Sequence, residues 1–286
     1  MKLIVQPDAG VMPIVRAIRS ARKKIDIFIF RFDRKEIETA LAAAVQRGVT
    51  VRALIAHTNR GGEARLRKLE QRLLASGVLV SRTATDLVRY HAKYMIVDSV
   101  LHLFGFNFTT LDIDKSRSFS IATRDMQAVQ EATRLFESDV TRQPFTLGRS
   151  NLVISPDNAR VALSSFIRGA RRELAIYDAK VHDPAMIKLL KDRATKGVKV
   201  RVIGNVKGKE GAIDARPLAL MRLHVRAIVR DGTRAFVGSQ SLRSEELEKR
   251  REVGLIINNP AVARKLLHIF DADWELSAKR KAKKAA

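Results

Sequence analysis

The chain contains an internal repeat, and this feature constrains its fold more than any other. Residues 18–52 align without a gap on residues 167–201, and ten of these thirty-five positions are identical. A histidine follows each copy, at residues 91 and 224, with a basic residue two positions later and an aspartate seven positions later. Two related halves with one histidine each predict a single active site at a pseudo-twofold interface.

Segments typical of helices and strands alternate in both copies. In the first copy, apolar spacing and runs of β-forming residues predict helices at 11–24, 35–47 and 62–76, and strands at 25–32, 49–56, 78–82 and 90–97. The second copy predicts helices at 159–172 and 184–196, and strands at 173–179 and 198–203. This alternation favours an α/β fold, with a mixed or mainly parallel sheet flanked by helices in each half. The second half is sixteen residues shorter between Arg201 and His224, and we expect it to lack the extra strand that precedes His91.

Turn-forming residues separate the two copies. Pro144, Gly148 and Pro156 interrupt the chain between them. We therefore predict an N-terminal half at 1–145, a C-terminal half at 151–275 and a basic tail at 276–286.

The charge of the chain points to an anionic partner. Lys and Arg number 54 against 30 Asp and Glu, a formal net charge of +24, which attracts phosphate-bearing molecules such as nucleic acid or an anionic membrane. The absence of cysteine excludes disulfides and thiolate chemistry. No apolar run approaches the roughly 18 residues of a transmembrane helix, and no secretory signal is recognisable. We expect a cytoplasmic protein, at most peripheral to the membrane, and a monomer, because one chain holds both halves.

The residues around each histidine are suited to binding phosphate. Positions i and i+2 of a strand share a face, so each histidine should lie beside its neighbouring cation, Lys93 or Arg226. Each aspartate stands seven residues after its histidine, an odd number, so its side chain would point to the opposite face of the strand. We therefore interpret Asp98 and Asp231 as structural.

A glycine follows fourteen residues after each histidine, at Gly105 and Gly238. Glycine permits close approach of the backbone, and short polar side chains after it can donate hydrogen bonds to phosphate oxygens. We predict this role for Asn107, Ser239 and Ser241. The remaining histidines are scattered without metal-ligand spacing, so we expect neither a metal nor a cofactor and interpret these residues as structural: His57, His102, His182 and His268.

These motifs resemble those of the phospholipase D superfamily. Residues 91–98 (HAKYMIVD) and 224–231 (HVRAIVRD) look like its HxKxxxxD motif, and residues 105–109 and 238–242 look like its GSxN motif. The resemblance extends from about residue 11 to residue 274. It implies two pseudo-twofold-related phospholipase D-like halves. It also implies a metal-independent reaction in which one histidine attacks phosphorus, giving a phosphohistidine, while the other protonates the leaving oxygen.

The sequence departs from the family pattern at several positions. Arg226 replaces a lysine, Ser241 replaces an asparagine, and the first copy reads Gly-Phe-Asn, one residue short. Glu252 matches the late glutamate of the family, whereas the corresponding position in the first half falls near Ser118. On this basis, only one histidine would have a carboxylate partner.

The resemblance assigns catalytic roles to five residues: His91, Lys93, His224, Arg226 and Glu252. A neighbouring carboxylate raises the pKa of a histidine and favours its protonated form. We therefore predict that Glu252 partners His224 as the general acid, which leaves His91 as the nucleophile.

Three functions are compatible with the sequence. The first is a phospholipase D-type phosphodiesterase that hydrolyses or transfers the phosphatidyl group of a phospholipid at an anionic membrane surface. The second is a nuclease of the same superfamily, although three Tyr and one Trp offer little surface for stacking single-stranded bases. The third is a catalytically degenerate protein that binds phosphate or polyanions. Intact histidines in both copies favour an enzyme.

Overall fold

The computed structural model describes residues 1–58, 63–208 and 213–285, with side chains as far as Ser277. The first half contains β1 (Lys2–Gln6), α1 (Met12–Arg19), β2 (Lys24–Ile29), α2 (Lys35–Gln46), β3 (Thr50–Ile55), α3 (Glu63–Ala75), β4 (Leu79–Arg82), β5 (Arg89–Tyr90), β6 (Tyr94–Val97), β7 (Val100–Phe104), α4 (Thr110–Asp114), β8 (Ser116–Thr123) and α5 (Met126–Thr141). The second half contains β9 (Leu152–Ser155), α6 (Ala159–Arg168), β10 (Glu173–Val181), α7 (Pro184–Thr195), β11 (Lys199–Val206), β12 (Asp214–Arg216), β13 (Arg222–Leu223), β14 (Arg226–Arg230), β15 (Arg234–Gly238), α8 (Ser244–Glu248), β16 (Arg250–Ile257) and α9 (Pro260–Ala285).

The shortening of the second half removes a helix, and our prediction that it removes a strand is wrong. Strand β12 pairs in parallel with β11, as β4 pairs in parallel with β3, so both halves keep this strand. Only seven positions, 207–213, separate β11 from β12, which leaves no room for a counterpart of the thirteen-residue α3. Gly62, the predicted first residue of that helix, lies outside the described residues.

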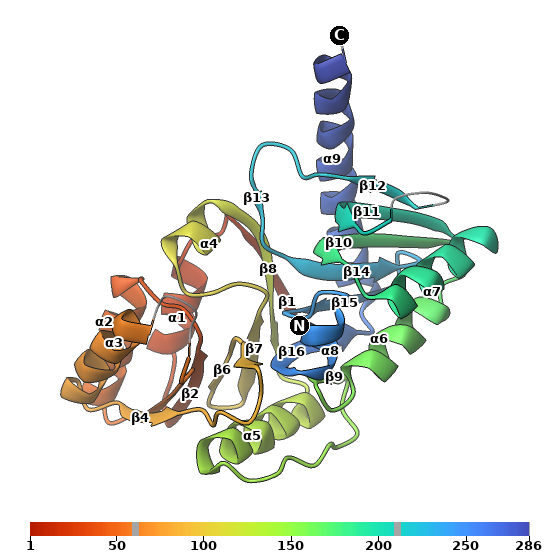
Figure 1. The fold of residues 1–286 in the computed structure, drawn as a ribbon. Coiled ribbons are helices and arrows are strands. Elements are labelled where there is room, and N and C mark those ends of the chain that lie inside the picture. Colours follow the sequence, from red (N-terminus) through yellow and green to blue (C-terminus); the bar gives the residue numbers. More distant parts are fainter. Residues whose placement is uncertain (59–62, 209–212, 286) are drawn as a thin grey trace.

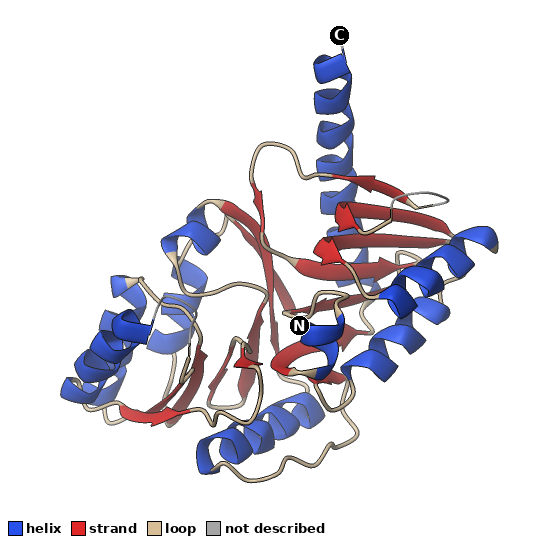
Figure 2. Ribbon diagram, in the orientation of Figure 1, coloured by secondary structure: helices blue, strands red, loops and turns tan. Residues whose placement is uncertain are grey.

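Each half is built on a mixed eight-stranded sheet (Figure 1). The first sheet has the order β1-β8-β7-β6-β2-β3-β4, with β13 beside β8, and the second has the order β12-β11-β10-β14-β15-β16-β5, with β9 beside β16. Helices flank the outer side of each sheet (Figure 2). The predicted architecture of two mixed α/β halves is therefore confirmed.

The two halves exchange their shortest strands. Strand β5 belongs to the first half in sequence but pairs in parallel with β16 of the second. Strand β13 of the second half pairs in parallel with β8 of the first, and Figure 1 shows it reaching across to that strand. Because each sheet includes a strand from the other half of the chain, neither half can form its complete sheet without the other.

The buried apolar side chains form three clusters. Two outer clusters pack α1, α2 and α3 against the first sheet, and α6 and α7 against the second. The central cluster combines residues of both sheets with α5 and α9, including Phe28, Tyr177, Phe270 and Trp274. Burial of this shared apolar surface stabilises the interface between the halves.

The C-terminal helix α9 continues to Ala285, so the backbone of the predicted basic tail extends this helix, which projects from the molecule in Figure 1. Among the described helices, none has both the length and the apolar character needed to cross a membrane.

Candidate active site

The strand exchange places His91 against the second half. Strand β5 pairs Tyr90 with Arg251 of β16, and the backbone N–H of His91 donates to the carbonyl oxygen of Arg251 at 2.8 Å. Glu252, the next residue on β16, is fully buried, and each of its carboxylate oxygens lies 2.9 Å from His91 Nδ1. Our prediction that Glu252 partners His224 is therefore wrong, because strand pairing brings it to the histidine of the other half.

Lys93 packs against His91, and both are buried. Its Nζ donates to the carbonyl oxygen of His91 at 2.6 Å and lies 3.1 Å from Nε2 of the imidazole. The ring of Phe30 contacts the same imidazole edge-on, with centroids 4.4 Å apart. The same Nζ is 3.0 Å from Nδ1, so it is nearly equidistant from the two ring nitrogens and does not lie along the Nε2 lone pair. With Nδ1–H donating to Glu252, Nε2 carries the free lone pair of His91.

The pairing of β13 with β8 holds the backbone of His224, as the pairing of β5 with β16 holds the backbone of His91. Its backbone N–H donates to the Arg117 carbonyl at 3.2 Å, and Ser118 Oγ donates to the carbonyl oxygen of His224 at 2.9 Å. Its Nδ1 lies 3.4 Å from Asp112 Oδ2, without the alignment of a hydrogen bond. Both histidines therefore have a carboxylate neighbour, and our prediction that only one would is wrong.

Asp112 is a site residue that the sequence analysis missed. It lies on α4, where it accepts hydrogen bonds from the backbone N–H and the Nδ2 of Asn107 at 3.0 and 2.6 Å, and it contacts Arg222. In the second half, Glu246 of α8 accepts from the backbone N–H of Ser241 at 2.7 Å. Each carboxylate thus stands five residues after its partner, a spacing that comparison of the two halves could have revealed.

The residues predicted to bind phosphate are all buried at this interface. Ser241 Oγ accepts a hydrogen bond from Arg226 Nε at 3.1 Å, which orients that guanidinium. Ser239 exchanges hydrogen bonds with the backbone of Val253 on β16. Asn107 Oδ1 is buried without a hydrogen-bond partner among the described residues.

Gly105 and Gly238 are not equivalent, although both follow their histidine by fourteen residues. The hairpin between β6 and β7 has a two-residue turn, whereas that between β14 and β15 has three residues. Gly105 therefore takes the place of Ser239, since each donates its N–H to the next strand, at Phe119 and Val253 respectively. The residue by which the first copy is shorter is therefore missing from the turn between β6 and β7 and not from the motif. Asn107 and Ser241 occupy matching positions in the two halves.

Asp98 and Asp231 occupy these turns with positive φ, at 50° and 55°. The carboxylate of Asp98 accepts from the backbone N–H groups of Arg22, Lys23 and Lys24 at 2.9–3.0 Å. Asp231 accepts from Arg171, Arg172 and Glu173 in the same manner. Both aspartates thus tie a hairpin turn to the start of the neighbouring strand, β2 or β10, which pairs antiparallel with the first strand of the hairpin.

Burial dominates the electrostatics of the site. It holds the pKa of both His91 and His224 well below the ordinary value, and the charges of Lys93 and Arg226 lower both further. Burial also lowers the pKa of Lys93 to about 7 and raises the pKa of Glu252 to about 7. The charges of the same two cations act on both imidazoles, as we expect for two histidines that belong to one site.

Asp112 behaves differently. Burial alone would raise the pKa of this carboxyl, but His224, Arg222 and Asn107 together bring it below its ordinary value. Asp112 therefore stays ionised beside His224 and favours the protonated imidazole there.

The two-histidine arrangement agrees with comparison to known families. A family model described as cardiolipin synthase, phospholipase D-like domain, matches residues 14–140 and 163–274. The chain belongs to this phospholipase D-like family. No curated protein sequence matches the chain.

Solved structures share the fold of this phospholipase D-like chain. Polyphosphate kinase from Porphyromonas gingivalis is 20% identical with a TM-score of 0.79, and the match covers 96% of this chain and 50% of the kinase, so the chain spans half its length. Phosphatidylserine synthase from Haemophilus influenzae Rd KW20 is 11% identical with a TM-score of 0.74, covering 96% of this chain and 86% of the synthase. At these identities the similarity shows the fold alone.

Proposed function

We propose that the chain is a phospholipase D-type phosphodiesterase that hydrolyses or transfers the phosphatidyl group of a phospholipid through a phosphohistidine. The observation that carries this proposal is the hydrogen bond from His91 Nδ1 to the buried Glu252, because it leaves Nε2 as the nucleophilic nitrogen. The family description and the name of the similar phosphatidylserine synthase both concern phospholipid chemistry, so we place phospholipid before nucleic acid.

In the first step, the Nε2 lone pair of His91 forms a bond to phosphorus. The bond from phosphorus to the leaving oxygen breaks with its electron pair. His224 gives that oxygen its proton, after the negative charge of the bound phosphodiester, together with that of Asp112, has raised the pKa of its imidazole. Lys93 and Arg226 neutralise the non-bridging oxygens. The hydroxyl of Ser239 and the Nδ2 of Asn107 already donate to Val253 and Asp112, so we assign these two side chains to holding the site together.

In the second step, His224 acts as a general base, and water or an alcohol takes the place of the departed leaving group. His224, now neutral, removes a proton from water or an alcohol, whose oxygen attacks phosphorus. The P–N bond breaks, and its electron pair returns to His91 Nε2.

The test is turnover of bis(p-nitrophenyl) phosphate in excess EDTA, with trapping of the phosphoenzyme. Wild type and His224→Ala should accumulate an acid-labile phosphohistidine in the peptide containing His91, whereas His91→Ala should form none and lose turnover. His268→Ala is the matched control, since this histidine is exposed on α9 outside the site. A label mapped to His224, or turnover that requires a metal, would overturn the proposal.

A further inference from the structure

Two buried arginines hold the backbones of the two histidines. Arg251 and Arg117 are each the second residue of a strand, β16 and β8 respectively. The carbonyl oxygen of Arg251 accepts the backbone N–H of His91 at 2.8 Å, and the carbonyl oxygen of Arg117 accepts that of His224 at 3.2 Å. Each arginine therefore contacts the histidine that belongs to the other half.

The side chains of these arginines point away from the imidazoles. Arg251 is paired with Tyr90 across β16 and β5, and its Cζ lies 5.9 Å from the centre of the Tyr90 ring, which belongs to the central apolar cluster. Alternate residues of a strand face opposite sides, so Glu252 and His91 lie on the other face. The guanidinium can therefore act on His91 only through the strands and not by direct contact.

Groups of the same kind fix the two guanidiniums. Arg117 Nε and Nη2 donate to the two carboxylate oxygens of Asp273 on α9 at 2.8 and 2.9 Å, and its Nη1 donates to the carbonyl oxygen of Gln6 at 3.2 Å. Asp273 also accepts a hydrogen bond from the hydroxyl of Tyr177 at 2.6 Å. The guanidinium thus connects α9 with the end of β1.

Arg251 has the corresponding contacts in the second half. Its Nε donates to Asp139 on α5 at 3.2 Å, and its Nη1 donates to the carbonyl oxygen of Ser155, at the end of β9, at 3.1 Å. The same Nη1 donates to Asp157 at 2.6 Å. Asp139 belongs to the first half, so this ion pair crosses the interface between the halves, as the pair on α9 does.

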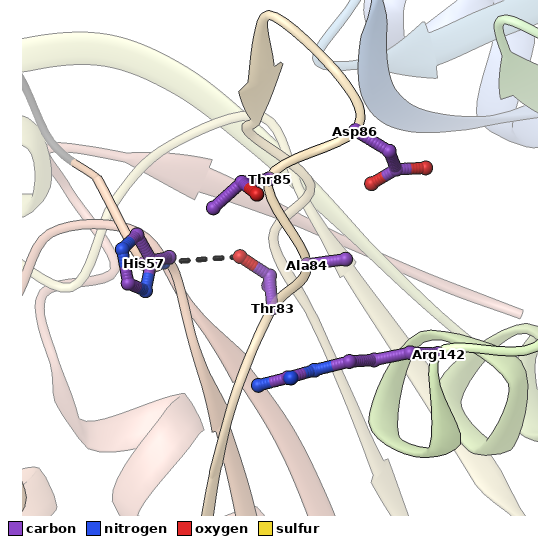
Figure 3. A pocket seen from close by; sticks show the side chains of 6 residues that line it. All are labelled: His57, Thr83, Ala84, Thr85, Asp86 and Arg142. Atoms are coloured by element: carbon purple, nitrogen blue, oxygen red, sulfur yellow. Dashed lines mark hydrogen bonds between the residues drawn. The ribbon is translucent and has the colours of Figure 1, made fainter.

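These contacts restrict the movement of each arginine and of the strand that carries it. A guanidinium presents its N–H groups in a fixed fork, so a side chain held at once by an aspartate and by a strand-end carbonyl has one position. The residue before His91 is held as well. The ring of Tyr90 packs on Arg251, and its hydroxyl donates at 2.8 Å to Asp86, which lines the cleft shown in Figure 3.

We infer that Arg117 and Arg251 are positioning residues for the reaction. Arg251 sets the place of β16, and so of His91 and Glu252, and Arg117 sets the place of β8, and so of His224. Because each arginine lies in the half opposite to its histidine, the ion pairs on α5 and α9 couple the assembly of the halves to the alignment of the catalytic groups. The inference goes beyond the proposed function, and its kinetic test rests on that function.

The first test observes the histidines without turnover. In ¹⁵N NMR spectra of histidine-labelled protein, Arg251→Lys should shift the imidazole nitrogens of His91 and leave those of His224 in place, and Arg117→Lys should have the opposite effect. Lysine keeps the charge, but it lacks the fork that reaches an aspartate and a carbonyl together. Substitution of each of the two histidines by alanine assigns the signals.

The second test compares phosphodiesters with p-nitrophenyl and methyl leaving groups. Arg251→Lys should lower kcat/KM roughly tenfold or more for both, because displacement of the nucleophile slows the attack on every ester. Arg117→Lys should lower kcat/KM much more for methyl esters, which need a proton on the leaving oxygen. Asp139→Asn and Asp273→Asn should each reproduce the effects of the arginine that the aspartate contacts, and they replace a lysine variant that does not fold.

Arg52→Lys is the matched control. Arg52 Nη1 donates to Glu137 on the same helix α5 at 2.9 Å, but Arg52 lies on β3, which pairs with β2 and β4. This variant should change neither the imidazole signals nor the leaving-group dependence. Equal shifts of both histidines in each arginine variant, or an effect of Arg52→Lys as large as that of Arg251→Lys, would reduce the role to general stability and overturn the inference.

Failure of the proposed function gives a different pattern. If neither ester is cleaved while the imidazole signals shift as expected, the phosphodiesterase is overturned and the positioning role stands. If the leaving-group dependences are exchanged between Arg251→Lys and Arg117→Lys, the roles of His91 and His224 are reversed, but each arginine still positions the histidine that it contacts.

Discussion

Substitution of Glu252 by glutamine tests which histidine this carboxylate serves. Its two oxygens each lie 2.9 Å from His91 Nδ1 in a fully buried environment. Glutamine keeps an acceptor at this place and removes the charge, so a charge-assisted hydrogen bond becomes a neutral one. A charge-assisted hydrogen bond contributes about 1.5–3 kcal/mol, and a neutral hydrogen bond contributes about 0.5–1.5 kcal/mol. A difference of about 1.4 kcal/mol corresponds to a roughly tenfold lower kcat/KM.

The assay compares phosphodiesters with good and poor leaving groups, such as p-nitrophenyl and methyl esters. A residue that supports the nucleophile affects every leaving group alike, whereas a residue that supports the general acid matters most when the leaving oxygen needs a proton. Glu252→Gln should therefore lower kcat/KM about tenfold across the series.

Asp112→Asn is the matched variant at the other histidine, 3.4 Å from His224 Nδ1. This substitution should lower kcat/KM only slightly with p-nitrophenyl esters, and the reduction in kcat/KM should grow as the leaving group becomes more basic. If Glu252→Gln shows this dependence and Asp112→Asn does not, the roles assigned to the two histidines are reversed and our reasoning is refuted.

Three further predictions follow from the fold and the site. Burial lowers the pKa of Lys93 to about 7 and raises the pKa of Glu252 to about 7, so the charge of Lys93 is lost above this pH and the charge of Glu252 is lost below it; kcat/KM should fall on both sides of pH 7, and a constant value from pH 6 to 9 would contradict this. Asp231→Ala removes the acceptor of three backbone N–H groups and should lower the free energy of unfolding by about 2 kcal/mol in urea titrations, and an unchanged midpoint would show that the turn needs no anchor. Residues 1–145 expressed alone should have no phosphodiesterase activity because β16 supplies Glu252, and turnover by this fragment would contradict the shared site.

The sequence predicts the features of this fold that depend on local patterns. Apolar spacing and the repeated glycines locate helices α1, α2, α6 and α7 and the strands between them to within a few residues. The exchange of β5 and β13 could not be predicted in this way. Each has two residues, too few for a periodic pattern, and β5 pairs Arg89 with Arg250, far along the chain.

The wrong prediction of the histidine that Glu252 contacts also results from the exchange of short strands between the halves. In sequence, Glu252 belongs to the half that contains His224, so proximity along the chain suggested that pair. Pairing of β5 with β16 instead brings it to His91. Asp112 was missed because Gly105 was aligned with Gly238, and the one-residue difference between the hairpin turns hides the match between Asn107 and Ser241.

The exchanged strands also determine when a growing polypeptide acquires its active site during translation. His91 leaves the ribosome early, but the residues that hold its backbone and its ring, Arg251 and Glu252, are added 160 or more residues later. Until then β5 has no strand with which to pair. A prematurely terminated product can thus contain both histidines and still lack the environment of the first. The environment of His91 is complete only when synthesis has passed residue 252.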